Sequence, residues 1–394
     1  MGVKVGNGPV SHPALRELNQ AHVLEVIRDK GPISRSDLVR QTKLAKPTVT
    51  AIVQDLLSAA IVREQGTRPA HGGSGRPAIL LEFNPRHQLV VGCHIGNRQI
   101  SVMVADLDGS PVAVRSRPTA AKSVSLVLDR LAELISAALA EADASQPPRA
   151  VGVSMPGQVD STGTCLHAFA RGWSSVPVAD LLMQRIQVPV SVHNDAKAAV
   201  MAEVAEGAAR GVSDVALLFE DQGIGTAIIS GGNLLHGARG AAGEIGHSYV
   251  PGATGECNCG KTGCLETVCS APALAVATRK LLGNQADATL PRHPGLADLA
   301  RLGRADVDAL LARAGHELGI ATSWLVNVVR PELIVLGGGL PEAGPAFLDA
   351  FRAAVSAQAV SDAADWLSIR ASSIPEGAEV RGAVLAALEL AARQ

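Results

Sequence analysis

Residues 241–266 have the sequence AAGEIGHSYVPGATGECNCGKTGCLE. Within it, one histidine and three cysteines are spaced as His247-x9-Cys257-x-Cys259-x4-Cys264. Three thiolates and one imidazole fit a closed tetrahedral zinc site of the structural kind. The alternative is a set of free, buried thiols, but three cysteines within eight residues amid glycines disfavour it. The sequence therefore predicts one structural zinc ion per chain at these four residues.

Composition and charge limit the classes of function. The 394 residues are 47% hydrophobic and 18% charged, which allows a large core and excludes global disorder. Residues 1–85 carry 11 Lys and Arg against 7 Asp and Glu, whereas the rest carries 24 against 30. A basic head on an acidic body indicates an anionic polymer as the partner of the head. The chain has only 3 Trp, 1 Tyr and 5 Phe, too few for single-strand binding by base stacking.

Cysteine usage and targeting signals point to the cytoplasm. Six cysteines in 394 residues form no disulfide framework, and a cluster of three is typical of metal binding in a reducing compartment. The first residues, MGVKVGNGPVSHPAL, contain no apolar signal-peptide core. No apolar run reaches about eighteen residues, the length of a membrane span. We therefore expect a cytoplasmic protein.

The first 83 residues have the pattern of a winged helix-turn-helix. Apolar periodicity predicts a helix over 12–29 that Gly31-Pro32 ends, and the capping box Ser34-Arg35-Ser36-Asp37 opens a second helix. A third helix over about 46–58 carries a one-sided apolar face, and residues 61–83 alternate around a glycine-rich turn. These elements predict a DNA-binding domain at 12–83, followed by a linker at 84–88.

The third helix is the one that enters the major groove in this class of domain. The apolar face turns inward, so the opposite face is free to touch phosphates and base edges. The residues expected to contact DNA on the third helix are Lys46, Thr48, Thr50 and Gln54. Phosphate contacts are expected at the start of the second helix, from Ser34, Arg35 and Ser36, and minor-groove contacts on the wing, from Arg68 and Arg76. A winged helix used for protein contact is the alternative.

Beyond the linker, strands alternate with helices. Segments such as 89–95, 151–155 and 333–340 predict buried strands, and 123–142 and 307–329 predict helices. Two sets of strands on either side of an Ala-rich helix predict an α/β domain over 89–394 with two lobes and a cleft. The first lobe is expected at about 89–195 with the C-terminal helix 380–394, and the second at about 196–379.

At this point the sequence resembles a known family. The Glu-x-x-His and Cys-x-Cys-Gly-x-x-Gly-Cys strings of residues 241–266 are similar to the signature of the ROK family of repressors and sugar kinases. The head resembles the winged helix of ROK regulators, and residues 88–394 resemble the actin-like, sugar-kinase-type domain. The resemblance implies zinc at the four residues above and a sugar pocket in the cleft. By family pattern the sugar hydroxyls would contact Asn194, Asp195, Glu244, His247 and Glu266. Taken alone, Asn194-Asp195 is also consistent with a turn or helix cap.

The sequence departs from the kinases of this family at the phosphate loops. The kinase Asp-x-Gly-Gly-Thr loop corresponds to His94-Ile95-Gly96-Asn97-Arg98, and the Gly-Thr-Gly-Ile-Gly loop to residues 221–225, DQGIG. A sugar-side asparagine before a Gly-Trp pair is replaced within 168–173, AFARGW, whereas the third nucleotide element, Leu336-Gly337-Gly338-Gly339, survives. We therefore expect no kinase activity.

These observations predict a transcriptional regulator, most simply a repressor. It would bind an operator in double-stranded DNA as a homodimer or tetramer, and a sugar or sugar phosphate in the degenerate cleft would control it. Two alternatives remain open. The regulator could be controlled by a protein partner instead of a sugar. Alternatively, the chain could be a sugar kinase with a DNA-binding head and Asp195 as its catalytic base.

Overall fold

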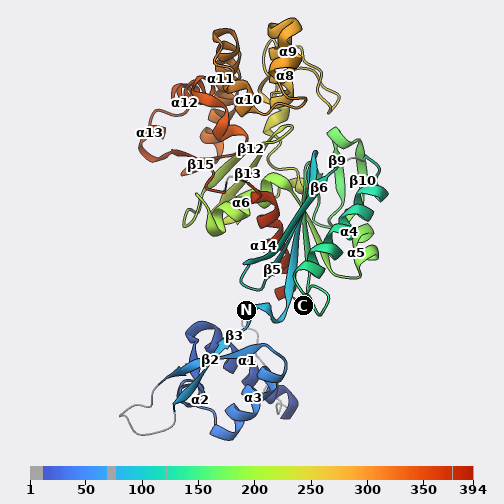
Figure 1. Cartoon of the computed structure of the whole chain (residues 1–394). Helices are drawn as coiled ribbons and strands as arrows, with labels where there is room; N and C mark the ends of the chain where they lie inside the picture. Colours follow the sequence, from blue (N-terminus) through green and yellow to red (C-terminus); the bar gives the residue numbers. More distant parts are fainter. Residues whose placement is uncertain (1–11, 69–76, 120–121, 375, 394) are drawn as a thin grey trace. The chain divides into compact units, whose positions relative to one another are not determined.

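The computed structural model describes residues 12–68, 77–119, 122–374 and 376–393, and the chain divides into two compact units (Figure 1). The first unit comprises Met1–Leu89 with Asp106–Asp108, and the second comprises Val90–Ala105 with Gly109–Gln394. Each unit has its own hydrophobic core. No helix in the described part of the chain is long and apolar enough to cross a membrane.

The first unit contains three helices and a small antiparallel sheet. The helices are α1 (His12–Lys30), α2 (Arg35–Thr42) and α3 (Lys46–Ser58). The strands, in sheet order, are β1 (Ile33–Ser34), β3 (Ala78–Phe83) and β2 (Val62–Arg68). This is the predicted winged helix-turn-helix, and the β2–β3 hairpin is its wing.

Packing of this head follows the apolar pattern of its helices. Val49, Ile52, Val53 and Leu56 turn one face of α3 into a core that also holds Leu38 of α2. The apolar periodicity of residues 12–29 places Leu18 on the same stripe as Val23 and Ile27, but in α1 Leu18 is 62% exposed, and Val23 and Ile27 supply the buried contacts.

The second unit is built around two five-stranded sheets. The first sheet has the order β11 (Val190–Asn194), β7 (Val151–Met155), β4 (Leu89–Ile95), β5 (Gln99–Asp106) and β6 (Pro111–Pro118). The second has the order β14 (Asn233–Leu234), β13 (Ile224–Ser230), β12 (Val215–Glu220), β15 (Leu333–Gly338) and β16 (Ser368–Ala371). Each sheet combines parallel and antiparallel pairs. In the first, β7 is parallel to β4 and β11, and β5 is antiparallel to β6. In the second, β12 is parallel to β15 and antiparallel to β13.

Helices and a third, small sheet complete the second unit. The small sheet consists of β8 (Gln158–Val159), β9 (Cys165–Ala168) and β10 (Trp173–Val176). The longer helices are α4 (Val124–Glu141), α5 (Val178–Ile186), α6 (Asp195–Glu206), α8 (Ala271–Leu282), α11 (Ala305–Val329), α12 (Gly344–Gln358) and α14 (Ala378–Ala392). The shorter ones are α7 (Glu266–Cys269), α9 (Ala286–Thr289), α10 (Leu296–Ala300) and α13 (Ala363–Trp366).

The C-terminal helix α14 packs on α6, the helix that begins at the end of β11 (Figure 1). Small residues make this close approach possible. A Cβ atom added at Gly382 of α14 would lie 1.8 Å from the backbone oxygen of Ala198 in α6. Because α6 carries Asp195 at its first turn, this packing fixes the position of a predicted ligand residue.

Candidate functional site

The four predicted metal ligands come together. His247 Nδ1 or Nε2 and the sulfurs of Cys257, Cys259 and Cys264 all lie within 4.8 Å of one another. The Cys259 and Cys264 sulfurs are 3.7 Å apart. Two sulfurs bound to tetrahedral zinc at about 2.3 Å are separated by about 3.8 Å, so this spacing suits that ion. The chemistry and the geometry of the donor set therefore fit zinc.

The imidazole of His247 lies between this cluster and an adjoining cavity. Its Nδ1 atom is 3.5 Å from the Cys257 sulfur, and its Nε2 atom is 3.6 Å from Glu244 Oε2. One ring nitrogen can therefore serve a metal while the other faces the carboxylate. Glu266 borders the cluster as well, with its Oε1 atom 2.8 Å from the Cys257 sulfur. Two acidic side chains of the cavity, Glu244 and Glu266, therefore lie directly beside the four predicted metal ligands.

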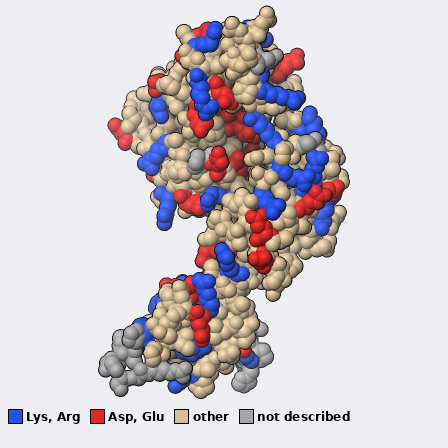
Figure 2. Space-filling view, in the orientation of Figure 1, with Lys and Arg blue, Asp and Glu red and all other residues tan. Residues whose placement is uncertain are grey.

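The cavity has a volume of about 140 Å³ and is lined by residues of several elements. All five predicted sugar ligands line it, namely Asn194, Asp195, Glu244, His247 and Glu266. The space-filling view shows acidic side chains gathered in a hollow of the larger unit (Figure 2). Carboxylates, an amide and an imidazole provide several hydrogen-bonding groups for the hydroxyls of a sugar.

Asn194 and Asp195 lie where β11 passes into α6. The Asn194 side chain caps this helix by accepting from the Lys197 backbone N–H at 3.1 Å, and its amide donates to Gly157 O. The capping role expected as the alternative is therefore present. Asp195 Oδ1 accepts from the Ala196 N–H at 2.8 Å, and burial raises the pKa of this carboxyl to about 6. A carboxyl group with this pKa can accept a proton near neutral pH.

Three further residues line the cavity and were not singled out as ligands from sequence. The Phe169 ring stacks on His167 at 5.4 Å and meets His247 edge-on at 5.7 Å. Lys197 is buried and donates to the backbone oxygens of His236 and Gly240. Phe169 lies within residues 168–173, where the sugar-side asparagine is replaced. No sequence signal indicated Lys197, because its contacts are with a loop about 40 residues further along the chain.

The third residue, Arg171, lies in the interior beside residues 94–98, at the end of β4. Its side chain is 7% exposed, and its guanidinium donates to the backbone oxygens of Ile95 and Gly96 at the end of β4. His94 of the same stretch pairs with Ser154, with 3.0 Å between Nδ1 and Oγ. Hydrogen bonds from Arg171 therefore hold the turn after β4, and Ser154 holds the side chain of His94 beside it.

Directly before residues 221–225, Glu220 ends strand β12 and is 3% exposed. Its Oε1 atom accepts from the Ala271 N–H at the start of α8, at 2.9 Å. A Cβ atom added at Gly339 would lie 2.4 Å from Glu220 Oε2, so the carboxyl group fills the space beside this turn. Burial raises the pKa of Glu220 to about 8. Asp221, the next residue, lines the cavity.

The side chains of the predicted DNA-contacting residues differ in their exposure and in their bonding partners within the head. Lys46, Thr50 and Gln54 of α3 are exposed and Thr48 is half-buried. Ser36 is exposed, whereas Ser34 is buried and caps α2, with its hydroxyl bonded to Asp37. Arg35 is half-buried and lies 3.4 Å from Glu64, and Arg68 is paired with Asp37. Arg76 lies outside the described residues.

Comparison with known proteins identifies the family. Residues 90–389 match the ROK family, and the chain belongs to it. It is 27% identical to the DNA-binding transcriptional repressor Mlc of Escherichia coli strain K12. The 386 aligned residues cover 96% of this chain and 95% of that protein.

Two solved structures support the same assignment. A ROK family transcriptional regulator, described as a homolog of the E. coli MLC protein, superimposes with a TM-score of 0.71 at 25% identity over 96% of each chain. A ROK family glucokinase from Streptomyces griseus, solved with glucose and AMPPNP, has a TM-score of 0.64 at 28% identity over 76% of this chain and 99% of its own. The larger unit therefore has the actin-like, sugar-kinase-type fold, and the regulator also covers the head.

Proposed function

We propose that this chain is a transcriptional repressor that binds duplex DNA through its winged helix and is controlled by a sugar or sugar phosphate in the cavity. The observation that carries the proposal is the division of α3 into two faces. Val49 and Ile52 are buried in the head, while Lys46, Thr50 and Gln54 are exposed. The similarity to Mlc and to a solved ROK regulator over 96% of this chain supports it.

The larger unit would sense the effector. Its cavity gathers Asn194, Asp195, Glu244, His247 and Glu266, and zinc held by His247 and the three cysteines would stiffen the wall of this cavity. An effector that binds one arrangement of the two lobes more tightly than another shifts the population between them. In a dimer, this shift would change the spacing of two heads on half-sites about 10 bp apart or a multiple of that distance.

Selection from a random pool of duplexes tests the DNA-binding part of the proposal. The full-length protein should enrich a roughly palindromic sequence, and binding to the enriched duplex should exceed binding to its scrambled version by at least about 1,000-fold. Gln54→Ala should lower this preference by about 1–3 kcal/mol if Gln54 contacts a base. Failure of the wild-type protein to enrich any sequence would contradict the proposal.

A further inference from the structure

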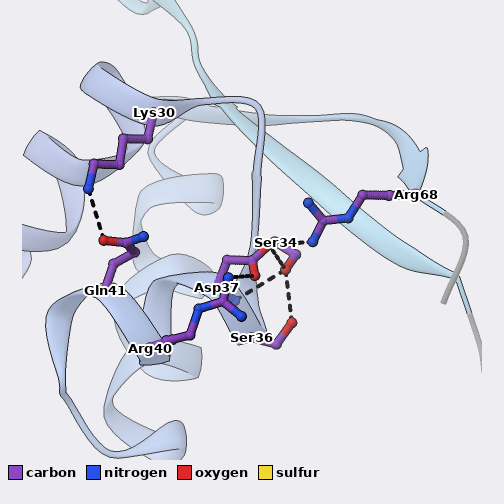
Figure 3. Close-up of polar contacts among 7 residues, drawn as sticks. All are labelled: Lys30, Ser34, Ser36, Asp37, Arg40, Gln41 and Arg68. Atoms are coloured by element: carbon purple, nitrogen blue, oxygen red, sulfur yellow. Dashed lines mark hydrogen bonds and ion pairs between the residues drawn. The ribbon is translucent and has the colours of Figure 1, made fainter. Parts of the chain in front are cut away.

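The carboxylate of Asp37 connects three parts of the head (Figure 3). Asp37 lies in the first turn of α2 and is 8% exposed. Its Oδ2 atom accepts from the Ser34 hydroxyl at 2.8 Å, and the Ser34 hydroxyl in turn accepts from the Asp37 backbone N–H at 3.2 Å. These two bonds fix the carboxylate at the helix start, because a capping serine holds the first turn of a helix in one conformation.

Two arginines from different elements meet this carboxylate. Arg40, one turn further along α2, donates to Asp37 Oδ1 at 2.7 Å, and Arg68, the last residue of β2, donates to Oδ2. The Arg40 and Arg68 side chains are 74% and 48% exposed, whereas the Asp37 side chain is 12% exposed. The two positive charges therefore face solvent, and the negative charge that holds them lies beneath.

The ion pairs of Asp37 persist at neutral pH. The hydrogen bond from Ser34 and the neighbouring Arg68 hold the pKa of Asp37 below its ordinary value, despite its burial. The carboxylate is therefore ionised at neutral pH, and both guanidinium groups keep a charged partner. The wing strand β2 and the helix α2 are thereby tied together by a bridge between residues 31 positions apart.

We infer that Asp37 is a positioning residue for sequence-selective DNA binding, because it holds Arg40 and Arg68 in fixed places relative to α2 and the wing. The inference rests on the proposed function. A guanidinium that is held before binding loses less conformational entropy on contact with a phosphate in the matching geometry. The carboxylate also weakens the general attraction of the two arginines for phosphates, so correct geometry contributes a larger share of the binding. Both effects favour the duplex that the whole head fits over random DNA.

Replacement of Asp37 by asparagine separates positioning from simple charge. Asp37→Asn keeps the size of the side chain and removes its charge, so the arginines become free to bind any phosphate. The probes are the duplex that the wild-type protein enriches from a random pool and a scrambled version, with binding measured by fluorescence anisotropy. We expect the ratio of the two affinities to fall about tenfold, a typical coupling for a contacting charged pair. Affinity for the scrambled duplex should hold or rise.

Glu82→Gln provides the matched control. Glu82 pairs with Arg63 at 2.8 Å across the same hairpin, so its replacement makes the same change in net charge within the wing. This variant should keep the wild-type ratio. An Asp37→Asn variant that is folded by its melting curve and keeps the wild-type ratio would overturn the inference, and so would an equal fall in Glu82→Gln.

A double-mutant cycle tests whether Asp37 acts through Arg68. The Arg68→Gln variant changes an exposed side chain and does not depend on the stability of α2. It should lower the ratio by itself, and adding Asp37→Asn should then change the ratio clearly less than it does in the wild-type background, because only Arg40 is left for Asp37 to hold. Equal effects of Asp37→Asn in both backgrounds would overturn the inference. If the wild-type protein shows no sequence preference, the proposed function fails and the inference with it. A wild-type preference that Asp37→Asn retains overturns the inference alone.

Discussion

Cys264→Ser is expected to release zinc and to destabilise the larger unit. In small zinc peptides the apparent binding free energy is about 10–16 kcal/mol, and that energy is partly folding energy. Regular sheet pairing within residues 247–264 is limited to two isolated bridges, Tyr249 with Cys264 and Glu256 with Thr262, and the other backbone hydrogen bonds of this segment are those of turns and loops. We therefore expect the melting temperature of this unit to fall by at least about 5 °C, as the loss of a few kcal/mol would produce.

Metal analysis of freshly purified protein is the first readout. Wild-type protein should contain one zinc ion per chain and Cys264→Ser none, and a strong chelator should reproduce the fall in melting temperature. Cys165→Ser is the control, because Cys165 is a buried thiol outside the cluster and its variant should keep zinc. Absence of zinc from the wild-type protein, or full occupancy in Cys264→Ser, would contradict the predicted site.

The second large effect is an absence of phosphoryl transfer. We expect the full-length protein to release ADP from ATP at less than about a thousandth of the 1–100 s⁻¹ typical of kinases, with any hexose or amino sugar. Asp221 lines the cavity, and unit charges 4 Å apart cost about 1–4 kcal/mol in a partly solvated site. Glu220 already accepts the first N–H of α8, so this helix start is not free for a phosphate. Arg171 holds the carbonyls of the turn after β4.

A coupled assay of ADP release over a panel of sugars measures this directly. The matched control is Asp195→Ala, which would remove the base of a kinase and should give the same background rate. Turnover by the wild-type protein that exceeds this control would show that the chain is a kinase with a DNA-binding head. The ROK glucokinase of known structure is a suitable positive control for the assay.

Local sequence signals predicted much of the architecture. The apolar spacing of Val49, Ile52 and Val53 gave the buried face of α3, and the helices predicted at 123–142 and 307–329 are α4 and α11 with shifts of at most two residues at each end. The metal cluster was predictable because three of its four ligands lie within eight residues. Each of these features depends on contacts that are near in sequence.

Contacts between distant residues could not be predicted in this way. The capping box at Ser34 and Asp37 was visible, but the partner Arg68 lies 31 residues further along and reaches Asp37 through the hairpin. Arg171 likewise lies 75 residues from Gly96, and only the fold brings its guanidinium to that turn. Glu220 had no signal, because its burial depends on the packing of α8 against the end of β12.

The most direct test of the account measures DNA affinity in the presence of candidate effectors. The wild-type protein is titrated onto its enriched duplex with and without each of a panel of sugars and sugar phosphates, and the measurement is repeated with Asp195→Asn. The account predicts that at least one compound changes the affinity about fivefold or more, as allosteric coupling of 1–3 kcal/mol requires, and that Asp195→Asn loses this response while keeping the affinity without ligand. Contradiction would come from DNA affinity that no compound in the panel changes, or from a response that Asp195→Asn retains in full.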